Sequence, residues 1–88
     1  MINSTNWGQA LNISLKSGWS DDKVSENLSG VVEALDQLST IFVPEVSESF
    51  LLGSNVELYG ARPIDALSYG KTEEVFEAIA VQKELMCS

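Results

Sequence analysis

A stripe of apolar residues, mostly three or four positions apart, runs from position 24 to position 42 and constrains the fold more than any other feature. Its members are Val24, Leu28, Val31, Val32, Leu35, Leu38 and Phe42. Because this spacing places them on one face of an α-helix, it predicts a long amphipathic helix. Ser20 suits its N-cap, and Pro44 requires the helix to have ended before it.

Other segments also have helical patterns, and none has the sustained alternation of a β-strand. We expect four more helices: over residues 4–16, from Pro44 to Leu52, from Pro63 to near Gly70, and from Glu73 to about Met86. The apolar residues that indicate three of them are Trp7, Ala10, Leu11 and Leu15 in the first, Val46, Phe50 and Leu51 in the second, and Val75, Phe76, Ile79 and Ala80 in the last. The chain has 88 residues and no long linker or repeat. It therefore predicts one all-α domain over residues 1–88, a bundle of about five helices.

Charge excludes some functions. The net charge is −8, with 13 acidic and 5 basic side chains. Nucleic-acid binding requires clustered Lys or Arg against phosphates, so we expect none by this chain alone. A basic protein partner would be attracted instead.

The chemistry of the side chains argues against an enzyme. The chain has no His and a single Cys87, so no nucleophile has a candidate base and no cofactor is expected. Asp22 and Glu26 are four residues apart, but two carboxylates on an exposed helix bind a cation weakly, and we expect no metal site. No apolar run is long enough to cross a membrane, and the start lacks a signal peptide, which predicts a cytoplasmic protein.

The segment from Gly60 to Gly70 specifies the local backbone closely. Pro63 suits the first position of a helix, and the preceding Arg62 is forced out of the α region. Asp65 falls in the first turn, and Gly70 fits a left-handed stop. A helix should thus begin at Pro63 and end near Gly70, with Thr72 as N-cap of the next.

The run from Leu58 to Leu67 (Leu-Tyr-Gly-Ala-Arg-Pro-Ile-Asp-Ala-Leu), followed by Gly70, Glu74-Val75 and Ile79, resembles the toxin-binding domain of Xre/MbcA/ParS-type bacterial antitoxins. That family carries an Arg-Pro-hydrophobic-Asp-hydrophobic-Leu segment, a Gly and a closing helix, after a Trp-Leu helix and a Leu-Gly-Gly turn. Here Phe50-Leu51 replaces the Trp-Leu pair, and Tyr59 replaces the first Gly. The resemblance covers roughly the C-terminal half of the chain, residues 44–88.

This resemblance implies an antitoxin that binds and neutralises a protein toxin. The toxin would be of the RES-domain, NAD-consuming type, inhibited by blocking its active site, and the antitoxin would bind no NAD. Because the C-terminal part of such antitoxins reaches into the toxin, the resemblance points to Lys83, Leu85 and Met86 as partner-binding residues.

Four more partner-binding candidates come from the residues themselves: Tyr59, Arg62, Tyr69 and Lys71. They lie within one short segment, and Tyr and Arg are enriched at interface hot spots. The alternative is that Arg62 simply pairs with Asp65.

Two other functions remain open. The acidity fits a phage-type inhibitor or adaptor that imitates nucleic acid for a basic protein. A remnant transcriptional regulator is the other, because the segment from Gly18 to Leu28 resembles the first helix of a helix-turn-helix. Apolar helix faces on so small a chain also allow a symmetric homodimer.

Overall fold

A central helix, α2 (Asp21–Leu38), is in contact with helices from both halves of the chain. The computed structural model describes the backbone of residues 4–87 and the side chains of residues 7–86, so the side chain of Cys87 lies outside the description. The elements are α1 (Ser4–Lys16), α2 (Asp21–Leu38), α3 (Pro44–Leu52), the 3-10 turn η1 (Val56–Leu58), α4 (Pro63–Ser68) and α5 (Thr72–Cys87). No β-strand occurs in this part of the chain, and the predicted all-α class with five helices is confirmed.

The two ends of helix α2 agree with the predictions made from Ser20 and Pro44. Ser20 precedes it in an extended conformation, and its side-chain oxygen accepts a hydrogen bond from the Lys23 backbone N–H at 3.3 Å. The helix ends at Leu38, well before Pro44, and buries Val31, Val32, Ala34, Leu35 and Leu38. Full burial of one Val or Leu side chain contributes roughly 1.5–3 kcal/mol, so this face is a main source of stability.

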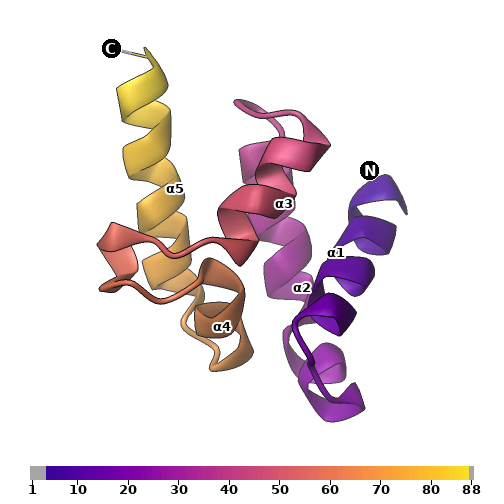
Figure 1. Cartoon of the computed structure of the whole chain (residues 1–88). Coiled ribbons are helices and arrows are strands. Elements are labelled where there is room, and N and C mark those ends of the chain that lie inside the picture. Colours follow the sequence, from indigo (N-terminus) through magenta and orange to yellow (C-terminus); the bar gives the residue numbers. More distant parts are fainter. Residues whose placement is uncertain (1–3, 88) are drawn as a thin grey trace.

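The remaining helices surround α2. Figure 1 shows α1 on one side of the molecule and α5 on the other, with α2, α3 and α4 between them. α1, α4 and α5 contact α2, while α3 packs on α4 and η1 on α5. The radius of gyration is 12.0 Å, the value expected for a compact domain of about this length. One hydrophobic core therefore joins the two halves.

Helix α1 is rotated from the orientation that its large apolar residues predict. Ala10, Ile13 and Ser14 are buried, whereas Leu11 and Leu15 are exposed. The small side chains of Ala10 and Ser14 allow α1 to approach α2 closely. The Ser14 hydroxyl donates to the Leu11 carbonyl at 2.9 Å, so its burial leaves no polar group unsatisfied.

The buried faces of α3 and α5 also differ in part from prediction. In α3, Leu51 is buried as expected, but Ser47 is buried and Val46 is exposed. In α5, Val75 and Ile79 are buried as expected, whereas Ala78 is buried in place of Ala80. The cause in α5 is η1, which packs on this helix and adds a second covered side that the sequence pattern did not reveal.

Candidate functional site

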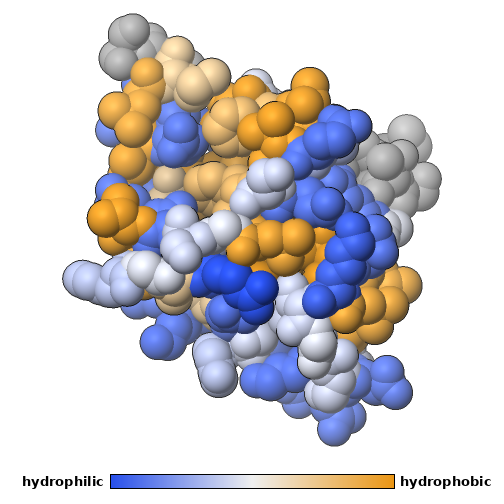
Figure 2. All heavy atoms as spheres, in the orientation of Figure 1, coloured by the Kyte–Doolittle hydropathy of each residue, from blue (hydrophilic) through white to orange (hydrophobic). Residues whose placement is uncertain are grey.

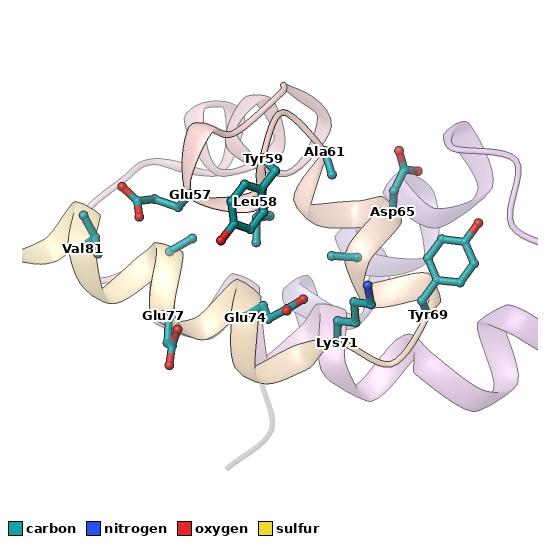
Figure 3. A pocket seen from close by; sticks show the side chains of 12 residues that line it. Glu57, Leu58, Tyr59, Ala61, Asp65, Tyr69, Lys71, Glu74, Glu77 and Val81 are labelled. Atoms are coloured by element: carbon teal, nitrogen blue, oxygen red, sulfur yellow. The ribbon is translucent and has the colours of Figure 1, made fainter.

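A groove of about 510 Å³ opens between the η1 turn, α4 and the first half of α5 (Figure 3). Its lining consists of Glu57, Leu58, Tyr59, Ala61, Asp65, Ala66, Tyr69, Lys71, Glu74, Glu77, Ala78 and Val81. We call it the acidic groove. All of these residues belong to the C-terminal half, and they include three of the predicted partner-binding residues: Tyr59, Tyr69 and Lys71.

One wall of the acidic groove is a loop that Asn55 holds closed. The Asn55 N–H donates to the Ala61 carbonyl at 3.0 Å, and the Asn55 carbonyl accepts from the N–H groups of Leu58 and Gly60 at 3.0 and 2.9 Å. The side-chain Oδ1 of Asn55 accepts from the Glu57 N–H at 2.8 Å. Four hydrogen bonds to one residue fix the path of this loop.

Tyr59 has an unusual conformation on that loop. Its φ of 57° and ψ of 36° are left-handed, and Gly60 follows with a φ of 86°. The left-handed region costs a non-glycine residue about 1–2 kcal/mol. The Tyr59 side chain is also 100% exposed, so packing of its ring does not offset this cost. Strain of this kind is concentrated at functional sites.

Arg62 is placed differently from Tyr59, Tyr69 and Lys71. It precedes α4 in an extended conformation, as predicted, with Pro63 as the first helical residue. Its Nε and Nη2 groups donate to the two carboxylate oxygens of Asp65 at 2.9 and 2.8 Å. The hydrogen bonds that Arg62 donates to Asp65 raise the pKa of Arg62, desolvation opposes this, and the negative charge of Asp65 adds to the rise. The expected pairing with Asp65 is thus present, and Arg62 does not line the acidic groove.

The turn between α4 and α5 is anchored to α2 through Lys23. The Lys23 ammonium donates to the Ser68 carbonyl at 2.7 Å and lies 4.7 Å from the centre of the Tyr69 ring. Gly70 follows with a φ of 77° and gives the left-handed stop that was predicted. The Tyr69 side chain remains 74% exposed. The role of Lys23 was not predicted, because it joins segments more than forty residues apart in sequence.

Helix α5 forms the opposite wall with one of its faces. Glu74, Glu77 and Val81 line the groove. In Figure 3 the Glu74 side chain extends toward Lys71, and the Glu77 side chain extends from α5 on the side away from the loop. Leu85, one turn beyond Val81, lies about 40° from it around the helix axis and continues this face. Lys83 and Met86 project from other sides of α5. Leu85 and Met86 are exposed, and Figure 2 shows apolar surface at this end of the helix.

The acidic groove combines an apolar floor with a charged rim. Leu58, Ala66 and Ala78 are buried at its base, while Glu57, Glu74 and Glu77 are exposed. These three carboxylates form no ion pair with any described residue. Their shared location was not predicted from the sequence, because only the packing of η1 on α5 brings Glu57 to the same groove as the two α5 glutamates.

The side chains that the structure describes include no group of three His, Cys, Asp or Glu residues that could hold a metal ion. None of the helices in residues 4–87 is long and apolar enough to cross a membrane. The chain matches no protein-family model, no curated protein and no solved structure.

Proposed function

We propose that the chain is an antitoxin-like protein whose C-terminal half binds and neutralises a protein toxin. The observation that carries this proposal is the left-handed turn at Tyr59 and Gly60, which leads directly into the Arg62-Pro63 helix start. The resembled family has two glycines at this turn, and consecutive positive φ angles are what a Gly-Gly pair adopts most readily. The turn geometry therefore supports the resemblance at the position where the residue type departs from it.

The surface of the C-terminal half also supports a protein partner. Tyr59 on the loop after η1 and Tyr69 at the end of α4 both expose large rings at the acidic groove, and Leu85 and Met86 expose apolar side chains at the end of α5. Exposed Tyr near a concave apolar surface is typical of interface anchors. By the resemblance, the toxin would be of the RES-domain, NAD-consuming type, blocked at its active site.

Co-expression with the product of the neighbouring gene tests the proposal. That product alone should arrest growth, and the chain should restore growth and co-purify with it. Leu85→Asp with Met86→Asp should weaken both effects. The matched control is Leu11→Asp with Leu15→Asp, which changes two exposed leucines on α1 at the opposite side of the molecule. Absence of both complex and rescue would refute the proposal.

A second candidate function is an acidic inhibitor of a nucleic-acid-binding protein. The unpaired carboxylates of the acidic groove and the net charge of −8 favour it. Such a complex would depend on many exposed charge pairs, so its affinity should fall steeply with added salt. An antitoxin interface with apolar anchors should lose far less affinity over the same range.

A further inference from the structure

We infer that the acidic groove binds a cationic, apolar-flanked segment of the partner protein: one or two Lys or Arg side chains next to a small aliphatic side chain. This inference rests on the proposed function, since it names which part of a toxin the chain would hold. It concerns the groove itself, whereas the resemblance points to the end of α5.

The charged side chains of the acidic groove indicate that its occupant is positively charged. The lining contains four carboxylates and one ammonium group, Lys71. Asp65 is already paired with Arg62, so Glu57, Glu74 and Glu77 are left for an outside cation. A phosphate-bearing ligand would be repelled by the same groups, and this argues against a nucleotide or nucleic acid.

The apolar floor of the groove determines which parts of the occupant's side chains can pack against it. Leu58, Ala66 and Ala78 form a base of small and aliphatic side chains. The stem of Lys or Arg can lie along such a surface while its charged head reaches the rim. Val81 and then Leu85 extend the aliphatic strip along α5, which gives a neighbouring apolar side chain of the partner a place to pack.

A second copy of the chain is a poor occupant. Lys16 is paired with Glu48, Lys23 is held by Ser68 and Tyr69, and Arg62 is held by Asp65. Lys71 belongs to the groove itself. Among the described residues, only Lys83 remains to enter the groove of a neighbouring copy. Two copies that each carry a net charge of −8 would also repel each other. The cation must therefore come from a different protein.

Exposed tyrosine rings add a third kind of contact. The Lys23 ammonium over Tyr69 already shows one ring of the groove binding a cation within the molecule. Tyr59 presents a fully exposed ring on the rigid loop opposite α5. An Arg or Lys of the partner can stack on that ring while a neighbouring cation reaches the glutamates of α5.

The test uses the intact chain and three labelled helical peptides: one with Lys and Leu on one face, one with Glu replacing Lys, and one with Ser replacing Leu. Only the first should bind well, and it should shift the amide resonances of residues 55–61 and 72–81. Glu74→Gln with Glu77→Gln should weaken binding roughly ten-fold. Glu26→Gln with Glu33→Gln, exposed on α2, removes the same charge and should change it less than two-fold.

Several outcomes would overturn the inference: no binding, resonance shifts elsewhere on the surface, or equal weakening by the two pairs of substitutions. The toxin assay separates this failure from failure of the proposed function. If the Glu74→Gln, Glu77→Gln protein still rescues growth and the Leu85→Asp, Met86→Asp protein does not, the toxin is bound without the groove. If the Lys-Leu peptide binds in the groove and no toxin is neutralised, the groove assignment stands and the antitoxin function fails.

Discussion

At the scale of single residues, Tyr59 combines backbone strain with a fully exposed aromatic ring. Its left-handed φ occurs in the loop that the hydrogen bonds of Asn55 hold closed, its own N–H donates to the Val56 carbonyl at 3.1 Å, and its ring contributes only exposed surface. Tyr59→Gly and Tyr59→Ala both remove the ring, but only glycine relieves the strain. We expect the Gly variant to be about 0.5–1 kcal/mol more stable than the Ala variant in urea unfolding.

Partner binding by the same two variants gives the complementary result. Both should lose affinity for the partner to a similar extent, because both lack the ring. If Gly and Ala proved equally stable, the loop would not be strained. If both bound the partner like the natural chain, Tyr59 would not belong to the interface.

The Arg62–Asp65 pair makes a pH prediction. The pKa of Arg62 is raised in the folded state, so its stabilisation is present at every pH below the ordinary pKa of Arg and is lost only as the pH rises past the raised value. The two side chains are 39% and 44% exposed, so solvent limits the contribution to at most about 1 kcal/mol. Arg62→Gln should therefore lower the unfolding free energy by a small amount that is constant between about pH 6 and 9. Urea unfolding at several pH values checks this, and a loss that grows or vanishes within that window would contradict it.

At the scale of elements, Gly30 determines how closely α2 approaches the start of α5. A Cβ at this position would lie 3.0 Å from Thr72 Cγ2 and 3.5 Å from Leu67 Cδ2. Gly30→Ala gains about 1 kcal/mol of helix propensity but incurs an overpacking cost of about 1–3 kcal/mol. We expect it to lower stability in the natural chain.

Thr72→Ser supplies the control for this prediction, because it removes the Cγ2 methyl group that a Cβ at position 30 would contact and keeps the hydroxyl. In the Thr72→Ser background, Gly30→Ala should raise the unfolding free energy by about 0.5–1 kcal/mol. A double-mutant cycle measures the change of sign. Equal stabilisation in both backgrounds would mean that the helices can separate at no cost.

The elements also show what the sequence can and cannot reveal. Prolines, glycines and Ser20 predicted the bounds of α2, α3 and α4, because these residues act through local backbone geometry. The rotation of α1 was not predictable, since it depends on how closely Ala10 and Ser14 let α2 approach. In the site, Tyr59, Tyr69 and Lys71 were predicted from one short segment, whereas Glu57, Glu74 and Glu77 come together only through tertiary packing.

At the scale of the whole molecule, the N-terminal half serves as the support for the C-terminal half. α4 and α5 both pack on α2, and Lys23 fixes the turn between them. Residues 44–88 alone would expose the apolar faces of α4 and α5, so we expect this fragment to show little helical circular dichroism and no cooperative melting. Adding a peptide of residues 1–43 should restore helical signal. Cooperative unfolding of the fragment alone would show that the halves are independent.

The central claim is that the C-terminal half captures a protein toxin, and growth rescue by co-expression with the product of the neighbouring gene tests it most directly. The claim predicts growth arrest by that product, rescue and co-purification with the natural chain, and loss of both with Tyr59→Ala despite a folded protein. Growth arrest that the chain does not relieve, with no complex formed, would contradict it.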